Sequence, residues 1–433
     1  MAILENIKHQ PFEFAPSSAD SEYGFAPNTN RKTEAELPQI FLSDGKPWHE
    51  VNQYAFARYY DQQKDLKTVK REMTHLSRYA NWLEEEGLHW LHFPKKRGER
   101  CLLKYRGHLI WLRREKLLAS STTSQAMRAV IAFYQWASDE GYAQARSKLF
   151  DNKNKVISFF DKVGFNRTMN ITTSELAIPN RKRTGILLED GLTPINQDSA
   201  EILMTYLSKH SNYELYLMFK TALLTGCRHE TITTLNIDAL RKSYPDPLLS
   251  SIMRVEVGPG SGVETKFDVS GSVYFPEPLI FELIEYFNSV RAVLRRSKSK
   301  NSLHRNIFLT SSGNRYTNQT FGTLLRRLKN ELIESGHTEF GRFQFHQLRA
   351  TFGTMMARAL LQSQGVSSLN AIEFVQEAML HKDANTTWKY IKFIENEPVE
   401  AQFLETLWEM FTGAKSKSKK IINHLTNERL HNV

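Results

Sequence analysis

The chain has 433 residues, of which 41% are hydrophobic and 24% are charged. This length is too great for one compact domain and indicates two or three, while the hydrophobic content excludes disorder of the whole chain. Lysine and arginine outnumber aspartate and glutamate by 57 to 47, which gives a net charge of +10 and favours a polyanionic partner.

Two cysteines, Cys101 and Cys227, are far apart and lack metal-ligand spacing. We therefore expect neither a disulfide framework nor a metal site, and no cofactor. The N-terminus, MAILENIKHQ, lacks the basic and then apolar pattern of a signal peptide, and no stretch approaches about 18 uninterrupted apolar residues. These features predict a soluble cytoplasmic protein that does not contact a membrane.

Residues 1–45 are predicted to form an irregular N-terminal arm, because Pro11, Pro16, Pro27 and Pro38 interrupt any helical or strand period. We interpret it as a flexible arm in preference to a DNA-contacting one.

Residues 46–160 are predicted to form a domain of four or five helices. In LKTVKREMTHLSRYANWLEEEGL (66–88), apolar residues recur every three or four positions, and Gly87 stands where a helix C-cap belongs. The polar break SSTTS (120–124) can cap the helix that follows, which is predicted to end at Gly141. Basic residues on successive helices fit a DNA-facing surface and an ordinary solvated face equally well. The candidates for DNA contact are Lys70, Arg71, Arg113 and Arg114.

Residues 161–190 are polar and basic and are predicted to be an interdomain linker, in which Arg181, Lys182 and Arg183 could lie along a phosphate backbone. Residues 191–411 are predicted to be mixed. One antiparallel β element is expected in RVEVGPGSGVETKFDVSGSVYF (254–275), where apolar and polar residues alternate between glycine-rich turns. Helices are expected at about 196–210, 212–224, 277–294, 318–335, 345–361, 368–379 and 397–411. Residues 412–433 form a basic tail.

Four segments of the second half carry side chains suited to holding a phosphate. In TALLTGCRHETITTL (221–235), Gly226 ends one helix and Arg228 begins the next. In FQFHQLRATFGTMMA (343–357), His346 and Arg349 are three apart and share a helical face, while Phe352, Met355 and Met356 are expected to anchor another. In AMLHKDANTTWKYIKF (378–393), His381 precedes Tyr390 by nine residues. The fourth is the hairpin segment ETKFDV, with Lys266.

These residue types fit chemistry at a phosphate. Guanidinium groups bind phosphate oxygens through paired N–H donors and neutralise charge in the transition state. Imidazoles donate to the phosphate or relay a proton, tyrosine supplies a nucleophile, and lysine can protonate a leaving oxygen. Each residue alone more often has a structural role, such as a cap, an ion pair or a core position. Their order within one region is what points to a site.

The same segments carry a family resemblance over roughly residues 48–410. TGCRHETITTL resembles the first arginine box of the tyrosine recombinases of the phage-integrase type, TGxRxxE. HQLRATFGTMM is similar to their HxLRHTFAT box, and MLHKDANTTWKYIKF resembles LGHxSxxTTxxYxH. The resemblance implies a mainly α protein with a small antiparallel β element. It would have a helical core DNA-binding domain and a mixed α/β catalytic domain that clamp double-stranded DNA, and it would act as a homo-tetramer without metal or ATP.

The resemblance also implies a role for each site residue. Arg228 and Arg349 would bind the scissile phosphate, and His381 would donate to one of its oxygens. His346 would take the tyrosine proton, Lys266 would be the general acid, and Tyr390 would form 3′-phosphotyrosyl DNA. The chain departs from the family pattern at three positions, where Thr231 replaces an acidic residue, Leu380 a glycine and Ala350 a frequent histidine.

The predicted function is therefore a site-specific DNA recombinase or integrase, acting for a mobile element at a bacterial nucleoid and leaving room for an accessory protein. A type IB topoisomerase or a telomere resolvase would share the chemistry. A DNA-binding protein that no longer cleaves is the alternative of another class. The tail, residues 412–433, is either a frayed end or a segment that docks in trans on a neighbouring protomer.

Overall fold

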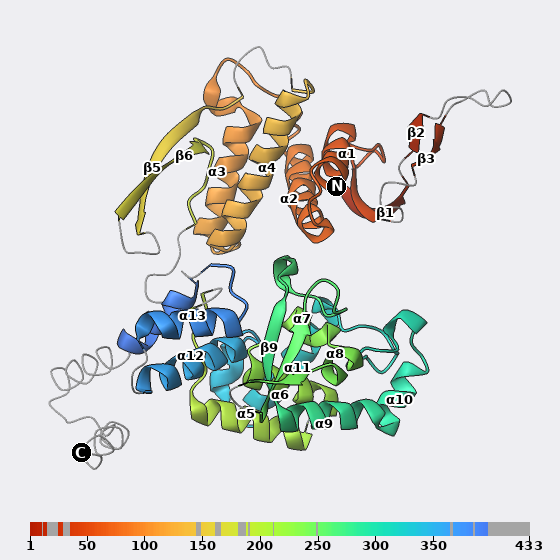
Figure 1. The fold of residues 1–433 in the computed structure, drawn as a ribbon. Coiled ribbons are helices and arrows are strands. Elements are labelled where there is room, and N and C mark those ends of the chain that lie inside the picture. The colour runs from red at the N-terminus through yellow and green to blue at the C-terminus, as the bar shows by residue number, and fades with distance from the viewer. Residues whose placement is uncertain are drawn as a thin grey trace. The chain divides into compact units, whose positions relative to one another are not determined.

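A computed structural model describes residues 1–10, 12–14, 25–28, 35–143, 149–160, 166–180, 188, 191–210, 212–247, 250–363, 367–383 and 386–396. The chain divides into two compact units, Met1–Thr184 and Gly185–Val433 (Figure 1). Arg181, Lys182 and Arg183, the predicted helix at 397–411 and the predicted tail lie outside the described residues.

The first unit is built on helices. They are α1 (His49–Phe56), a π-helical turn (Ala57–Asp61), α2 (Leu66–Glu85), a 3-10 turn (Arg97–Glu99), α3 (Cys101–Arg114) and α4 (Ser120–Asp139). Helix α2 begins after Asp65, whose carboxylate accepts from two backbone N–H groups. The predicted cap of α4 is wrong, because the SSTTS segment already lies in its first turns and the cap residue is Ala119.

Large aromatic side chains fill the core of this unit. Tyr79 and Tyr134 are both fully buried, and their hydroxyl groups lie 2.8 Å apart. The Tyr134 hydroxyl donates to the carbonyl of Trp90, and the Phe133 ring meets the Trp48 ring edge-on at 5.7 Å. Burial raises the pKa of both tyrosines well above its usual range. The two phenols therefore stay neutral and serve as hydrogen-bonding groups within the core.

The predicted irregular arm at residues 1–45 is wrong where the structure describes strands. β1 (Ile3–His9) pairs antiparallel with β4 (Ala35–Phe41), with Ile3 opposite Phe41, and β2 (Phe12–Phe14) pairs with β3 (Phe25–Pro27). Proline does not prevent this pairing, because both strands of a two-stranded ladder are edge strands. The Asn52 side chain fixes β4 by bonding the backbone N–H and carbonyl of Ile40, at 2.8 and 3.1 Å.

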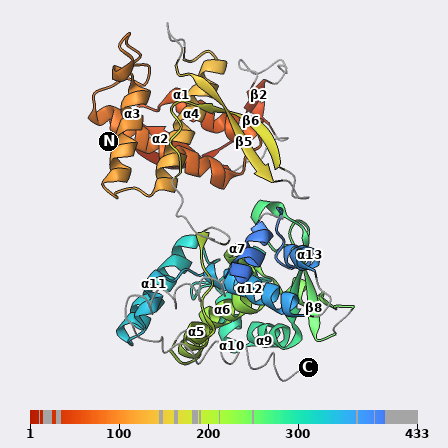
Figure 2. The same ribbon diagram turned by 90° about the vertical axis from the view of Figure 1, so that its left-hand side faces the viewer.

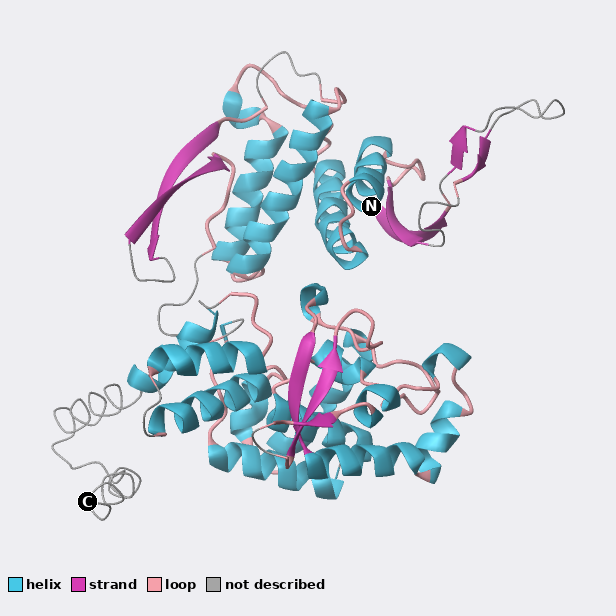
Figure 3. Ribbon diagram, viewed as in Figure 1, coloured by secondary structure: helices cyan, strands magenta, loops and turns pink. Residues whose placement is uncertain are grey.

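The predicted boundary between a helical domain and a linker at residue 160 also needs correction. β5 (Asn152–Phe160) and β6 (Asn166–Ser174) form an antiparallel hairpin across it (Figure 3). Several β-branched residues favour strands here, although the segment is polar enough to resemble a linker. Arg97 forms ion pairs with Asp151 and Glu175 at the open end of the hairpin.

The second unit combines helices with one small sheet. Its first helices are α5 (Gln197–His210), α6 (Tyr213–Thr225), α7 (His229–Thr234) and α8 (Ile237–Arg241). The sheet has the order β7 (Tyr244–Pro245), β8 (Ile252–Val257) and β9 (Gly271–Pro276), all antiparallel, with Val257 opposite Gly271. The predicted fold class, mainly α with small antiparallel β elements, is confirmed.

The remaining helices follow the sheet in the chain. They are α9 (Glu277–Asn288), α10 (Val290–Arg296), α11 (Asn318–Glu334), α12 (Gln347–Gln362), α13 (Ser368–Ala378) and a last helical segment at 386–396. The single helix predicted at 277–294 is two helices, because Ser289 leaves the helical conformation and caps α10. Helix α12 packs beside α6 and α13 (Figure 2).

Two hydrophobic clusters hold the second unit together. The larger surrounds Phe219, Phe275 and Phe308. The smaller joins α12, α13 and the last helical segment and contains Tyr390 and Ile391 together with several alanines. Among the described helices, none is long and apolar enough to cross a bilayer. Within the same described ranges, no cluster of three or more histidine, cysteine, aspartate or glutamate side chains could hold a metal ion.

Candidate active site

The turn between α6 and α7 presents Arg228. Gly226 ends α6 in the left-handed conformation, at φ 64°, which glycine adopts without the strain that a side chain would cause. A Cβ at this position would lie 2.4 Å from the Phe352 ring, so α12 approaches the turn closely. Arg228 follows as the residue that caps α7 and is half-buried. The predicted helix end and helix start are both found here.

Arg349 joins three segments of the second unit. Its side chain is 3% exposed. One terminal nitrogen, Nη1, donates to the carbonyl of Gly226, and the other, Nη2, donates to the carbonyl of Met379, each at 2.6 Å. The guanidinium therefore ties α12 to the turn before Arg228 and to the turn before His381. Hydrogen bonds from a charged donor are strong, so this geometry is firmly held.

His346 stands at the N-terminal end of α12, where it is half-buried and adopts helical dihedral angles. It lies one turn before Arg349 on the same helix, as the sequence predicts. The expectation that Met355 anchors α12 is wrong, because its side chain is 61% exposed. Phe352 and Met356 do pack against the smaller cluster.

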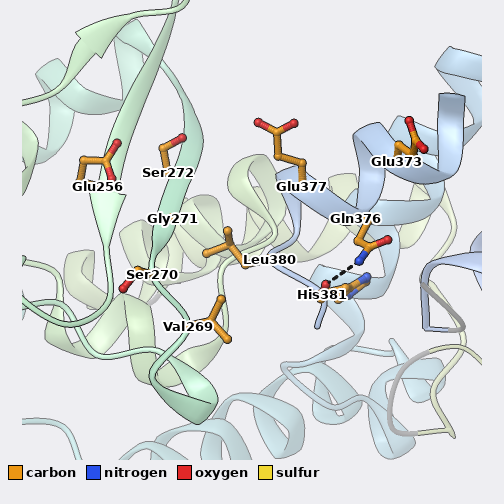
Figure 4. A pocket seen from close by; sticks show the side chains of 10 residues that line it. All are labelled: Glu256, Val269, Ser270, Gly271, Ser272, Glu373, Gln376, Glu377, Leu380 and His381. Carbon is orange, nitrogen blue, oxygen red and sulfur yellow. Dashed lines mark hydrogen bonds between the residues drawn. The ribbon is translucent and has the colours of Figure 1, made fainter. Parts of the chain in front are cut away.

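His381 is held by short-range contacts in the turn after α13. Its ring nitrogen Nδ1 lies 2.9 Å from the Thr387 hydroxyl. The Gln376 side-chain amide donates to the backbone carbonyl of His381 at 3.1 Å (Figure 4), and the His381 N–H donates to the Gln376 carbonyl at 3.0 Å. The imidazole is 6% exposed, so its orientation is fixed by its own turn.

Tyr390 has no exposed surface. Its ring stacks on the His381 ring, with centroids 5.9 Å apart. Gly353 of α12 makes room for it, because a Cβ there would lie 2.7 Å from Tyr390 Cε1 and 2.6 Å from Met379 Sδ. The side chain of Tyr390 is therefore enclosed in this conformation of the protein.

The two arginines line one small pocket. Its wall also includes Cys227 from the α6–α7 turn, Thr265 from the β8–β9 connection, and Met379 and Leu380 from the turn after α13. Burial raises the pKa of the Cys227 thiol, which therefore contributes a neutral surface between the cationic groups. Sequence reasoning missed Thr265 and Met379, because no motif marks a side chain whose role depends on a neighbouring turn.

A second pocket adjoins this one (Figure 4). Gly271 and Ser272 of β9 lie on one side, and Glu373 and Glu377 of α13 lie on the other. Leu380 lines both pockets and points from its turn toward β9.

Lys266 lies in a short 3-10 turn (Lys266–Asp268) in the connection between β8 and β9. It is half-buried, and its Nζ lies 5.3 Å from the centre of the Phe267 ring. The preceding residue, Thr265, lines the arginine pocket. The antiparallel pair of β8 and β9 predicted from the sequence is present, and Lys266 lies next to a pocket residue in the chain but is not among the residues that line either pocket.

The departures from the family pattern have structural settings. Thr231 is 6% exposed and lines the arginine pocket in place of an acidic side chain. Ala350 is 1% exposed, within the cluster that holds Tyr390. Leu380 adopts φ 49°, the left-handed region in which glycine is favoured. A glycine there would relieve backbone strain, so the leucine needs a compensating contact.

The predicted DNA-contacting residues of the first unit differ in their surroundings. Lys70 forms an ion pair with Glu36 at 3.4 Å, and Arg113 donates to the Pro179 carbonyl at 3.2 Å. Arg71 and Arg114 are exposed. The last two have the more accessible charge for binding a phosphate backbone.

Comparison with known proteins identifies the class. Residues 194–397 match the model described as the phage integrase family. The matched range contains Arg228, Lys266, His346, Arg349, His381 and Tyr390. Residues 194–397 therefore form a domain of the phage integrase family, and the predicted resemblance to the tyrosine recombinases is confirmed for this part of the chain.

Solved structures of integrases are similar to the chain. The Tn1549 transposon integrase in complex with a circular intermediate DNA is 15% identical, with a TM-score of 0.47, over 79% of this chain and 93% of that one. A lambda integrase dimer bound to a COC′ core site is 12% identical, with a TM-score of 0.47, over 79% and 76%. A lambda integrase tetramer bound to a Holliday junction is 13% identical, with a TM-score of 0.42, over 78% and 77%. A search of curated proteins gave no significant match.

Proposed function

We propose that this tyrosine recombinase cleaves and rejoins double-stranded DNA through a 3′-phosphotyrosyl intermediate on Tyr390, in the service of a mobile element. The observation that carries the proposal is the double hydrogen bond of Arg349 to the carbonyls of Gly226 and Met379. It draws the segments of Arg228 and His381 to one pocket, and Tyr390 packs against His381.

In the proposed cleavage step, the hydroxyl oxygen of Tyr390 attacks the scissile phosphorus, and its proton passes to His346. The bond from phosphorus to the 5′ oxygen breaks, and Lys266 gives that oxygen a proton. The products are a 3′-phosphotyrosyl ester and a free 5′ hydroxyl.

The other three site residues bind the phosphate in this proposal. Arg228, Arg349 and His381 donate to its non-bridging oxygens and neutralise the charge that grows in the pentacoordinate transition state. The phosphotyrosyl ester conserves the free energy of the broken bond. A 5′ hydroxyl from a second duplex can therefore reverse the step and complete strand exchange without ATP.

The cleavage proposal is tested with nicked duplexes tiled over the DNA on both sides of the gene. A nick a few nucleotides 3′ of the cleavage site lets the short fragment that carries the free 5′ hydroxyl diffuse away. The covalent adduct therefore accumulates, and it survives denaturant. We expect an adduct with the wild-type chain and none with Tyr390→Phe. DNA binding without an adduct would favour a DNA-binding protein that no longer cleaves. Relaxation of supercoiled DNA that lacks paired sites would favour a type IB topoisomerase.

The proposal extends to assembly. We propose that the chain acts as a homo-tetramer on paired sites at the nucleoid of a bacterial cytoplasm, with its tail docking on a neighbouring protomer. The tail joins a lysine- and serine-rich stretch (415–420) to the apolar residues Ile421, Ile422 and Leu425, a composition that suits a tethered docking segment. Deletion of 414–433 should spare binding to one half-site and impair synapsis. A deleted chain that recombines normally would leave the tail without this role.

A further inference from the structure

We infer that Leu380 and Lys382 are positioning residues that hold the Lys266 loop in place from the two sides of His381. The loop is the connection between β8 and β9, residues 258–270. The inference rests on the proposed function in one respect, since it takes Lys266 as the general acid of DNA cleavage.

Leu380 contacts the loop where it enters β9. A Cβ built on Gly271 would lie 2.6 Å from Leu380 Cδ2, so the leucine methyl group occupies the space that a side chain at 271 would need. Figure 4 shows the Leu380 side chain directed at this strand. Leu380 is half-buried despite its left-handed φ of 49°. This conformation is strained for a residue with a side chain, and the contact with Gly271 compensates for that strain.

Lys382 contacts the loop at its tip. Its Nζ donates to the carbonyl of Phe267 at 3.1 Å and lies 5.1 Å from the centre of the Phe267 ring. Phe267 and Asp268 have φ values of 66° and 52°, which residues with side chains rarely adopt. Phe267 is also 68% exposed, so little burial holds the tip. A contact from outside the loop is therefore needed to keep it in this conformation.

The two contacts fix the part of the loop that carries Lys266. The Thr265 hydroxyl donates to the Val269 carbonyl at 2.7 Å, which closes residues 265–269 into one small ring. Lys382 holds this ring at Phe267, and Leu380 holds the chain just beyond it at Gly271. Because His381 lies between the two positioning residues, one turn orients a proposed phosphate ligand and also places the proposed acid.

A sulfur-substituted DNA separates placement of the acid from other effects. In this substrate the scissile 5′ oxygen is replaced by sulfur. A thiol has a pKa near 8.5, far below that of an alcohol, so a thiolate leaves without being protonated. A variant with a defective general acid should therefore cleave the sulfur substrate at a normal rate. A variant with a defective phosphate ligand or nucleophile should cleave both substrates slowly. Cleavage is measured in single turnover, with enzyme saturating, on nicked duplexes with oxygen or sulfur at the same position.

The variants are Leu380→Ala, Lys382→Met and Lys266→Ala. Lys298→Met is the matched control, because Lys298 also donates to a loop carbonyl, that of Ser311 at 3.2 Å. We expect Leu380→Ala and Lys382→Met to slow cleavage of the oxygen substrate roughly tenfold to a hundredfold, because a misplaced general acid loses only part of its typical contribution of about a hundredfold to ten-thousandfold. Both should cleave the sulfur substrate within about twofold of wild type, and Lys298→Met should match wild type on both.

Three results would overturn the inference. In the first, Leu380→Ala and Lys382→Met cleave the oxygen substrate at the wild-type rate. In the second, both variants cleave the oxygen and sulfur substrates equally slowly, although Lys266→Ala cleaves the sulfur substrate at close to the wild-type rate. In either case the positioning role alone fails. If sulfur does not rescue Lys266→Ala, the proposed acid is wrong, and the inference falls with it. Lys382 is exposed, so Lys382→Met provides the test even if Leu380→Ala does not fold.

Discussion

The two units each contain a tyrosine with no exposed surface, Tyr134 in the first and Tyr390 in the second. Tyr134 lies among large rings, since Trp90 and Phe133 are within 5.7 and 5.3 Å of it, and its hydroxyl donates to a backbone carbonyl. Tyr390 lies against His381 and the bare backbone of Gly353, in a cluster that contains three alanines.

Burial alone therefore does not separate a structural tyrosine from the proposed nucleophile. The neighbours do. Withdrawing Tyr134 would expose several aromatic side chains at once, which is costly because apolar burial contributes roughly 25 cal/mol per Å². Tyr390 sits on the last described helical segment, and its ring stacks on the small polar ring of His381 and lies over the backbone of Gly353. We therefore expect Tyr134 to serve the framework of the first unit, and Tyr390 to serve the proposed cleavage step.

The largest contrast is expected from removing each hydroxyl group. Tyr390→Phe should abolish the covalent DNA adduct, because no other atom of the side chain can form the ester, and it should leave DNA binding near wild type. Tyr134→Phe should leave adduct formation intact but lower the free energy of unfolding of the first unit by about 1–2 kcal/mol, because the Trp90 carbonyl loses its donor. Adduct that persists in Tyr390→Phe would move the nucleophile to another tyrosine.

A second contrast lies within the catalytic unit. Arg228→Lys and Arg349→Lys both keep the charge and lose the planar fork, so each should slow cleavage by roughly a hundredfold or more. Arg349→Lys should also lower thermal stability, because it loses one or both of the bonds to the Gly226 and Met379 carbonyls. Adduct yield and melting temperature measure the two effects separately. Wild-type cleavage by both variants would refute the assignment of this pair.

Two glycines test whether the space around Tyr390 matters. Gly353→Ala places a methyl group against Tyr390 and Met379, so we expect cleavage to fall about tenfold and stability to fall by about 1–3 kcal/mol. Gly107→Ala is the control on helix α3, where a Cβ would meet nothing within 4 Å. That change should raise the stability of the first unit by about 0.5–1 kcal/mol. Full activity in Gly353→Ala would show that the Tyr390 site adapts freely.

The smallest effect concerns pH. Burial lowers the pKa of His75 in the first unit, with help from the charges of Arg78 and Arg71, and burial also lowers that of His229 in the second. A histidine with a lowered folded pKa binds fewer protons when folded than when unfolded. Both units should therefore lose stability as pH falls below the unfolded value of about 6.5. The free energy of unfolding, measured with a denaturant at pH 7.5 and pH 5.5, should show this loss. His229→Gln should reduce the loss in the second unit only.

Local signals predicted most of the helices, and they marked the segments that the structure brings together around the arginine pocket. Apolar periodicity located α2, α6, α11 and α12, and the three boxes located the residues that surround the arginine pocket. The N-terminal strands were missed, because four prolines dominate the local pattern and the pairing of β1 with β4 joins residues about 30 positions apart. The hairpin of β5 and β6 was missed because its polar residues resemble a linker.

The contacts that organise the site were beyond sequence reasoning for a similar reason. Leu380 is visible as a departure from the family glycine, but its left-handed backbone and its contact with Gly271 appear only in three dimensions. The bonds of Arg349 to two backbone carbonyls have no sequence signature, because any residue can supply a carbonyl.

The buried position of Tyr390 bears on the safety of the host chromosome. A recombinase that searches for its site meets very many ordinary phosphates, and each encounter with an exposed nucleophile would risk a single-strand break. If Tyr390 is the nucleophile as we propose, its enclosure would make a brief collision harmless, and only a complex that lasts until Tyr390 is exposed would be cut. Selectivity then comes partly from residence time, so a poorly matched site is protected because the protein leaves it too soon.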